Sequence, residues 1–260
     1  MYNSLLRQHF LVQKGMYFDY DLTWEKWHFL MSSIIEDGFW NYAILPETCD
    51  ITRDLSSVES IFNNTDRVPS VYIIDEEKCP NITELLKMEG YEKMAEESFM
   101  TYCCNDCAKP NVRGKIIIRR AVDGDNMKDF IDVFTNAYGG EKTPDQPYGE
   151  LDKTYMDALI RSLKNTDKFY HFVCYVDGNP VSVASLCYEN GKGGIYNVGT
   201  RLNERGCGYG TAATMACIEK WNELNGDILF LQTETGSNVE AWYYTLGFKL
   251  EFHGSTYCKE

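Results

Sequence analysis

The sequence predicts an α/β fold in which helices fall between the strands of a mixed sheet. Three features of the 260-residue chain support this class. From residue 115 onward, apolar strand-like runs alternate with amphipathic helical stretches. One strand pair is joined by Asp177-Gly178-Asn179-Pro180, which is a hairpin signal and predicts antiparallel neighbours. A glycine-rich turn, "RLNERGCGYGTAAT", then leads from a strand into a helix.

The elements follow in a consistent order along this half of the chain. "KIIIRRA" is a β-branched run typical of a buried strand. "DGDNMKDFIDVFTNAYGG" has its apolar residues at helical spacing and closes on Gly139 and Gly140, where glycine permits a left-handed cap. The remaining elements are a helix near residues 151–163, the hairpin strands of residues 169–189, a strand at 193–200, a helix at 209–226, a strand at 227–234, a short helix at 238–246 and a closing strand or strand pair at 247–259.

The glycine-rich turn indicates an anion site. Gly206, Gly208 and Gly210 precede a helix, and the first N–H groups of a helix, together with its dipole, favour phosphate. A P-loop would need Gly-Lys-Ser/Thr after its last glycine, where this chain has Gly210-Thr211-Ala212. A dinucleotide fingerprint would need glycine in place of Thr211. Neither of these phosphate-binding loops fits the spacing.

The spacing Arg-x-x-Gly-x-Gly, formed by Arg205, Gly208 and Gly210, resembles the pyrophosphate-binding loop of the GNAT superfamily of acyl-CoA-dependent N-acyltransferases. The resemblance covers roughly residues 115–260 and implies a GNAT-like fold with acetyl-CoA as co-substrate. In that family the strand before the loop splays open and pairs with the pantetheine arm. The cofactor-binding residues implied here are Val198, Gly199, Thr200, Arg205, Gly206, Cys207, Gly208, Tyr209, Gly210, Thr211 and Asn238.

A second segment, "SNVEAWYYTLGF", resembles the family's other signature, in which a tyrosine stands four residues before a Gly-Phe pair. Gly247-Phe248 selects Tyr243, which the resemblance implies as the general acid. Its neighbour Tyr244 would point about 100° away on a helix and cannot share the role. Asn238 lies five residues before Tyr243 instead of the usual seven, so its cofactor contact is left open.

The implied reaction is direct attack of a primary amine on the acetyl thioester, with no covalent enzyme intermediate. The tetrahedral oxyanion would need N–H donors, which the strand around Val198 can supply, and the departing thiolate would need a proton from Tyr243. The amine must first become neutral, since a lysine-like amine titrates at about 10.4 in water. Glu234, at the end of a strand, is the candidate base, and a solvated or helix-capping glutamate is the alternative reading.

The N-terminal half resembles a degenerate, partial copy of the same fold. "NITELLKMEGYEKMAEESFMTYC" aligns with "NVEAWYYTLGFKLEFHGSTYC", and the glycine stands nine positions after the asparagine in both. Leu86 then replaces the tyrosine, and residues 50–66, which match the phosphate loop and its helix, contain no glycine. We therefore predict a non-catalytic GNAT-like domain at residues 1–112 and a catalytic N-acetyltransferase domain at residues 113–260. Four aromatic residues are predicted core of the first: Trp24, Trp27, Phe29 and Trp40.

Composition excludes several classes of partner. With 39 acidic and 25 basic residues the formal net charge is −14, which would repel a phosphate backbone, so we expect no nucleic-acid partner. No apolar run reaches membrane-spanning length and no secretion signal is visible, so we expect no membrane association and a cytoplasmic location. The ten cysteines are then reduced thiols. The cluster of Cys103, Cys104 and Cys107 lacks the further ligands of a zinc site, and no metal is predicted.

The acceptor is expected to be a primary amine of a small molecule or a peptide. The negative charge favours a cationic acceptor, and the Pro144–Pro147 loop is a candidate wall of its site. The oligomeric state stays open, a homodimer included. One alternative is a non-catalytic acyl-CoA-binding regulatory protein, since half of the chain has lost its catalytic parts. Another is a peptide-binding adaptor, suggested by the acidic balance and the aromatic content.

Overall fold

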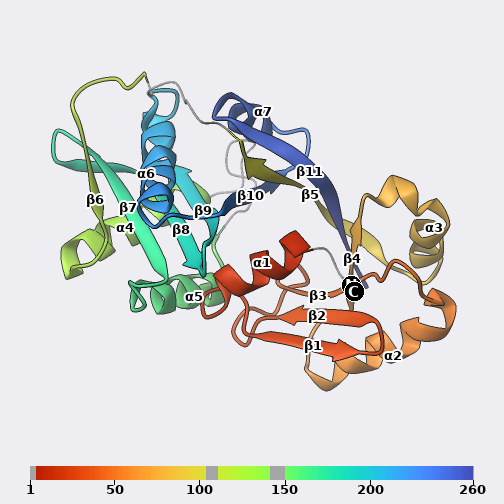
Figure 1. Cartoon of the computed structure of the whole chain (residues 1–260). Helices are drawn as coiled ribbons and strands as arrows, with labels where there is room; N and C mark the ends of the chain where they lie inside the picture. The colour runs from red at the N-terminus through yellow and green to blue at the C-terminus, as the bar shows by residue number, and fades with distance from the viewer. Residues whose placement is uncertain (1–3, 104–110, 141–149, 260) are drawn as a thin grey trace. The chain divides into compact units, whose positions relative to one another are not determined.

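The computed structural model describes residues 4–103, 111–140 and 150–259. By its contacts the chain divides into two compact units: unit 1 comprises Met1–Thr101 and Gln232–Glu260, and unit 2 comprises Tyr102–Leu231. Each unit is built of helices packed on a mixed set of strands (Figure 1). The predicted α/β class with a mixed sheet is confirmed.

Unit 2 has the strand order β10-β9-β8-β7-β6. The strands β6 to β9 are successive antiparallel neighbours, whereas β10 runs parallel to β9 and carries the chain from unit 2 into unit 1. The strands are β6 (Ile116–Arg120), β7 (Phe169–Val176), β8 (Asn179–Glu189), β9 (Lys192–Thr200) and β10 (Ile228–Glu234). The helices are α4 (Gly124–Tyr138), α5 (Lys153–Leu163), the 3-10 turn η2 (Leu202–Glu204) and α6 (Tyr209–Glu223).

Helices cover both faces of the unit 2 strands. Val173 of β7 packs in one apolar cluster with Phe130 of α4 and Leu159 of α5. The next residue, Cys174, packs in another cluster with Tyr209 of α6. Because successive residues of a strand point to opposite faces, α4 and α5 lie on one face and α6 on the other.

Local turn chemistry decides two boundaries of unit 2. The β7–β8 turn places Asp177 at φ 49 and Gly178 at φ 85, the two positive values of a type I′ hairpin, which confirms the predicted turn. Of the two glycines predicted to close α4, Gly140 has a positive φ of 132, whereas Gly139 is extended, with φ −99. A β-carbon at Gly139 would lie 2.9 Å from the Thr135 carbonyl oxygen, so close approach to α4 is what glycine permits there.

Unit 1 has the strand order β1-β2-β3-β4-β11-β5. The strands are β1 (Tyr20–Trp24), β2 (Trp27–Met31), β3 (Asn41–Ile44), β4 (Ser70–Ile74), β5 (Glu92–Tyr102) and β11 (Phe248–Cys258). The helices are α1 (Ser4–Gln13), α2 (Ile51–Asn64), the 3-10 turn η1 (Glu76–Lys78), α3 (Pro80–Met88) and α7 (Asn238–Thr245). Of the predicted core aromatics, Trp27, Phe29 and Trp40 are buried, and Trp24 is partly exposed and packs against the cluster that contains Trp27 and Phe29.

The internal repeat is visible in the order and direction of the strands. β1, β2 and β3 are antiparallel neighbours and β3 runs parallel to β4, just as β7, β8 and β9 are antiparallel and β9 runs parallel to β10. The helices α2 and α6 form the corresponding crossovers. After α3 and α7, the aligned glycines Gly90 and Gly247 have φ 86 and 91, which only glycine adopts freely. The two sequence stretches therefore adopt the same local structure.

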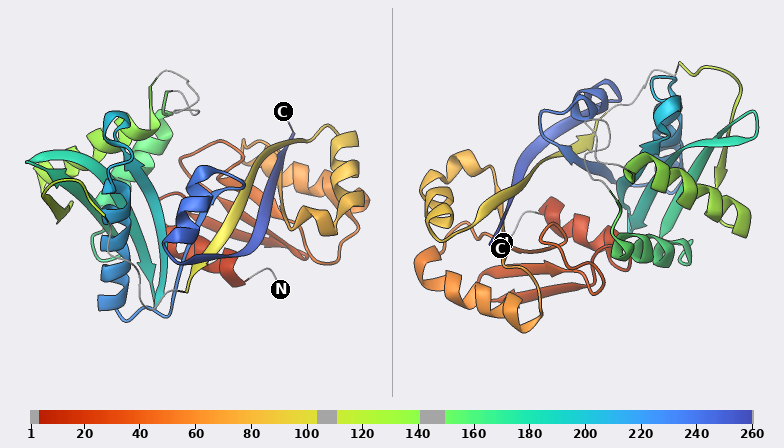
Figure 2. Two further views of the ribbon diagram at one scale, coloured as in Figure 1. Left: turned by 90° about the horizontal axis from the view of Figure 1, so that it is seen from above. Right: turned by 180° about the vertical axis from the view of Figure 1, so that it is seen from behind.

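The last strand of the chain pairs with a strand of the N-terminal copy. β11 is antiparallel to β4, with Gly254 opposite Ile74 and Cys258 opposite Ser70. It also lies side by side with β5 in both views of Figure 2. Residues 232–260 fall in unit 1 for this reason. The compact units thus differ from the predicted domains of residues 1–112 and 113–260. The division between residues 112 and 113 stays a prediction of where one copy of the fold ends and the next begins.

One carboxyl is buried in unit 1. Glu97 of β5 is 8% exposed and its side chain is hydrogen-bonded to Gln232. Burial disfavours the charged form and raises the pKa of Glu97 from 4.5 to about 8. The folded state therefore holds this proton more tightly than the unfolded chain does.

We predict that this carboxyl makes unit 1 less stable as the pH rises from about 4.5 to about 8, because the unfolded chain releases the proton first. The loss should be about 1 kcal/mol per pH unit. Glu97→Gln should remove this dependence, and Glu92→Gln, an exposed position of the same strand, should keep it. Urea unfolding at pH 5 and pH 8 measures the difference. Equal pH dependence in the wild type and both variants would contradict the assignment.

Candidate cofactor site

One edge of β9 opens where the predicted cofactor residues lie. β9 pairs with β8 as far as Thr200. Its pairing with β10 covers only Lys192 to Gly194. Within the described part of unit 2, the residues from Ile195 to Thr200 therefore have no strand neighbour on the β10 side. Backbone N–H and C=O groups on such an edge need other partners, so the edge is suited to an extended ligand that carries amides.

A β-bulge lies in this stretch of β9. Ser185 of β8 faces Tyr196, but Val183 faces Gly199, so β9 has one extra residue between the two pairs. Asn197, within the bulge, has φ 55, which is the left-handed region that asparagine adopts more readily than most residues. The bulge changes the direction in which the following residues present their backbone groups.

The carbonyl groups on the open edge have partners within the protein. The N–H of Arg201 donates to the Val181 carbonyl of β8 at 3.0 Å, so by alternation Thr200 and Val198 face the opposite, open side. The Val198 carbonyl accepts a hydrogen bond from the Tyr138 hydroxyl at 2.7 Å. The Thr200 carbonyl accepts one from Arg205 Nε at 3.3 Å. The open edge therefore presents backbone N–H groups beside carbonyls that are already bonded, which suits a ligand oxygen.

The glycine-rich loop joins this strand to α6. Gly206 has φ 76 and Gly208 has φ 82, so both need the conformational freedom of glycine. Gly208 is the N-cap of α6 and has no side chain to cap the helix. The start of α6 is therefore not blocked by its own N-cap residue, and the helix dipole favours an anion there. Arg205 Nη2 donates to the Ala137 carbonyl at 3.2 Å and ties the loop to the end of α4.

Residues 111–113 support the loop from outside. The N–H of Arg113 donates to the Cys207 carbonyl at 3.1 Å, and the Tyr209 hydroxyl donates to the Arg113 carbonyl at 3.0 Å. A β-carbon at Gly208 would lie only 2.4 Å from the Asn111 carbonyl oxygen. At Gly206 a β-carbon would meet nothing within 4 Å. Gly208 is thus needed for both its backbone angle and its close packing.

The other three predicted site residues lie in unit 1 and are described there. Tyr243 of α7 is buried, with its ring 4.6 Å from that of Trp242 and 5.6 Å from that of Phe248 between centroids. Asn238 is the exposed first residue of α7. Glu234 is the exposed last residue of β10, and its backbone carbonyl accepts a hydrogen bond from Ser237 Oγ at 2.7 Å.

A different glutamate, Glu240, takes part in capping the start of α7. Ser237 is the N-cap and accepts from the N–H of Glu240 at 3.1 Å, as in a capping box. Glu240 is buried, and its carboxylate accepts from the N–H of Gly236 at 2.6 Å and from Ser98 Oγ at 2.8 Å. The helix-capping role that the sequence left open for Glu234 therefore belongs to Glu240.

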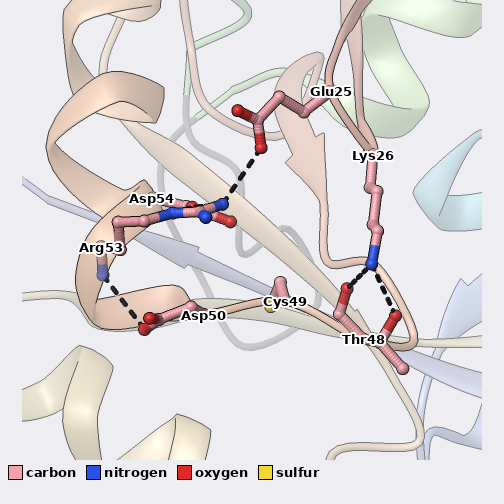
Figure 3. A pocket seen from close by; sticks show the side chains of 7 residues that line it. All are labelled: Glu25, Lys26, Thr48, Cys49, Asp50, Arg53 and Asp54. Atoms are coloured by element: carbon pink, nitrogen blue, oxygen red, sulfur yellow. Dashed lines mark hydrogen bonds and ion pairs between the residues drawn. The ribbon is translucent and has the colours of Figure 1, made fainter.

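The N-terminal copy differs at the matching position. There α2 has Asp50 as its N-cap, and the Asp50 carboxylate accepts from the N–H of Arg53 at 3.3 Å. Arg53 is itself paired with Glu25 at 3.1 Å and with Asp54 at 2.6 Å (Figure 3). A shallow pocket of about 270 Å³ at this place is lined by Glu25, Lys26, Thr48, Cys49, Asp50, Arg53 and Asp54. The chain's own carboxylate occupies the position that α6 leaves to an anion, and this geometry favours the predicted loss of phosphate binding in the first copy.

Sequence reasoning missed two residues that shape the site. Tyr138, at the end of α4, bonds the Val198 carbonyl, and nothing in its spacing pointed to β9. Asn197 was visible inside "IYNVGT", and asparagine within a strand is a signal for a positive φ that could have indicated the bulge. The Pro144–Pro147 loop, predicted as an acceptor wall, lies outside the described residues.

The described residues contain no group of three or more His, Cys, Asp or Glu side chains that could hold a metal ion. Of the cluster at Cys103, Cys104 and Cys107, only Cys103 is described, and its side chain is exposed. Nor does any helix in the described ranges combine the length and apolar character needed to cross a bilayer.

Comparison with known proteins agrees with this geometry. Residues 132–248 match the model of the Acetyltransferase (GNAT) family. A search of curated proteins found no match. Among solved structures, a GCN5-related N-acetyltransferase from Kribbella flavida is similar with a TM-score of 0.70 at 16% identity, over 98% of this chain and 94% of that one. One from Sphaerobacter thermophilus has a TM-score of 0.65 at 14% identity, over 90% of this chain and 76% of that one.

A tandem GNAT protein from the clavulanic acid biosynthesis pathway is also similar, with a TM-score of 0.59 at 11% identity, over 90% of this chain and 78% of that chain. At these identities the likeness concerns the fold alone. The fold is thus the GNAT fold, present in two related copies. The chain carries a GNAT acetyltransferase domain at residues 132–248, and its N-terminal half also matches GNAT structures.

We predict that Gly208→Ala lowers both thermal stability and affinity for coenzyme A. A left-handed backbone costs an alanine about 1–2 kcal/mol, and the added methyl group also meets the Asn111 carbonyl. Gly206→Ala is the matched control, because it carries the same backbone cost in open space. Thermal unfolding and titration calorimetry with coenzyme A measure the two effects. If both variants unfold at the same temperature, the packing against residue 111 does not matter.

Proposed function

We propose that this protein is an acetyl-CoA-dependent N-acetyltransferase that transfers an acetyl group to a primary amine. The observation that carries the proposal is the open edge of β9 followed directly by a helix whose N-cap is glycine. An extended edge of backbone groups suits the amides of a pantetheine arm, and a helix start without a side-chain cap suits a diphosphate. Both features lie in the GNAT-matched segment.

The residues proposed to hold the cofactor are those of the strand end and the loop. The backbone at Val198 to Thr200 would face the pantetheine arm and the thioester, and the N–H groups from Arg205 to Thr211 would face the diphosphate. When bound, acetyl-CoA supplies the activated acetyl group. N–H donors held in a fixed position beside the thioester oxygen would stabilise the negative charge that develops as the amine attacks.

Proton transfer is assigned to two residues of unit 1. Tyr243 is proposed as the general acid for the departing thiolate, because it stands four residues before Gly247-Phe248 in the family's spacing. Glu234 is proposed as the base for the amine because it stands at the end of β10. Asn238 is proposed as a further cofactor contact. The acceptor is proposed to be a cationic small molecule or peptide, because the chain carries a formal net charge of −14.

We predict that Tyr243→Phe keeps acetyl-CoA binding and lowers kcat about 100-fold or more, since general acid catalysis contributes on that order. Tyr244→Phe is the matched control: it makes the same change one residue away on an exposed side chain. A thiol-release assay with acetyl-CoA and a library of amines gives the rate, and calorimetry gives the binding. Unchanged turnover in Tyr243→Phe would remove Tyr243 from the acid role.

The same experiments separate this proposal from its alternatives. Wild-type protein that binds acetyl-CoA and releases no thiol with a broad panel of amines would favour a regulatory acyl-CoA-binding protein. Failure to bind any acyl-CoA would contradict the proposal as a whole and favour a peptide-binding adaptor. The proposal expects one coenzyme A bound per chain, since the first copy fills its matching position with Asp50.

A further inference from the structure

A chain of polar side chains, three of them buried, runs from α5 to the β9 bulge. It begins on α5, where Ser162 Oγ lies 3.0 Å from His171 Nε2. His171 of β7 has its other ring nitrogen, Nδ1, 2.7 Å from Ser185 Oγ on β8. Asn197 Nδ2 in turn donates to Ser185 Oγ at 3.1 Å. We name these four residues, Ser162, His171, Ser185 and Asn197, the bulge relay.

The hydrogen-bond directions in the bulge relay follow from its two ends. Ser162 Oγ donates to the Leu159 carbonyl at 2.6 Å, so it accepts from His171, whose Nε2 must carry the proton. Nδ1 of His171 then accepts from the Ser185 hydroxyl, which leaves Ser185 Oγ to accept from Asn197. Every bond has one donor and one acceptor, and the imidazole is neutral. Burial lowers the pKa of His171 to about 3, so it stays neutral at physiological pH.

The position of this network distinguishes it from ordinary core packing. His171, Ser162 and Ser185 are at most 1% exposed, so no solvent competes for their hydrogen bonds. The chain ends at the one residue of β9 that has a positive φ. The next residue is Val198, whose backbone faces the open edge. A fixed Asn197 therefore sets the direction of the Val198 N–H group.

We propose that the bulge relay is a positioning device for acyl transfer: it holds Asn197 in the left-handed conformation that aims the Val198 backbone N–H at the thioester oxygen. The inference rests on the proposed function and adds positioning residues to it. It assigns no proton transfer to His171. The neutral ring of His171 is held by Ser162 of α5 and fixes the Ser185 hydroxyl, which in turn fixes Asn197 of β9. The ligand recognised is the carbonyl oxygen of an acyl thioester.

Asn197→Gly tests the proposal, because glycine accepts the same φ and loses only the side chain. We expect kcat to fall about tenfold or more while the KM for acetyl-CoA changes little, since small displacements of a stabilising donor cost rate more than binding. Asn190→Gly is the matched control. Asn190 has φ 47 in the turn between β8 and β9, so the substitution carries the same backbone cost away from the bulge.

Ser185→Ala breaks the same relay from β8 and should lower kcat in the same way. The double variant Asn197→Gly with Ser185→Ala should lose no more than the larger of the two single losses, because both single variants remove the contact between Asn197 and Ser185. Infrared spectra of bound acetyl-CoA, labelled with carbon-13 at its carbonyl, add a direct readout. The thioester stretch should shift to higher frequency in both single variants and stay at the wild-type value in Asn190→Gly.

The outcomes are separable. If wild-type protein binds no acetyl-CoA, the proposed function fails and this inference with it. If the wild type is active and Asn197→Gly matches Asn190→Gly in kcat and in the carbonyl frequency, the positioning role is overturned while the function stands. Additive losses in the double variant would also overturn it, because they would show that Asn197 and Ser185 act separately.

Discussion

A β-strand that loses its neighbour must still satisfy its backbone groups, and the rest of unit 2 depends on how β9 meets this constraint. In the described part of unit 2, β9 pairs with β10 only from Lys192 to Gly194. Its edge carbonyls are bonded by a tyrosine from α4 and by the arginine of the glycine loop. Because these carbonyls already accept hydrogen bonds, the edge offers a ligand backbone N–H donors and few carbonyl acceptors.

The two copies share one architecture but differ at the N-cap of the crossover helix, which is Asp50 in α2 and Gly208 in α6. Strand order, the parallel crossover and the positive φ of Gly90 and Gly247 are shared. The helix starts differ, since α6 begins behind a glycine and α2 begins behind an aspartate. A carboxylate on the N-cap satisfies the helix start and stabilises it by about 1 kcal/mol. The first copy has gained helix stability at the place where the second leaves room for an anion.

Much of the fold could be predicted because its signals are local. The Asp177-Gly178 turn, the helical spacing before Gly139 and the glycine loop each depend on a few adjacent residues. The strand and loop that we propose to hold the cofactor were predicted from a resemblance carried by short motifs, which are also local. Two kinds of feature could not be found. The bonds from Tyr138 and His171 depend on distant contacts that leave no periodic trace, and the pairing of β11 with β4 depends on residues 70–74 and 254–258 meeting across most of the chain.

This last pairing has a consequence for synthesis on the ribosome. When the N-terminal half has emerged, β4 has no partner for the side that β11 will occupy, because residues 248–258 are synthesised only after unit 2. An uncovered strand edge in a partly made chain is a template for wrong pairing with other nascent chains. The two copies therefore cannot fold one after the other as independent domains. The sheet of the first copy stays open beside β4 until β11 has been synthesised and can pair with it.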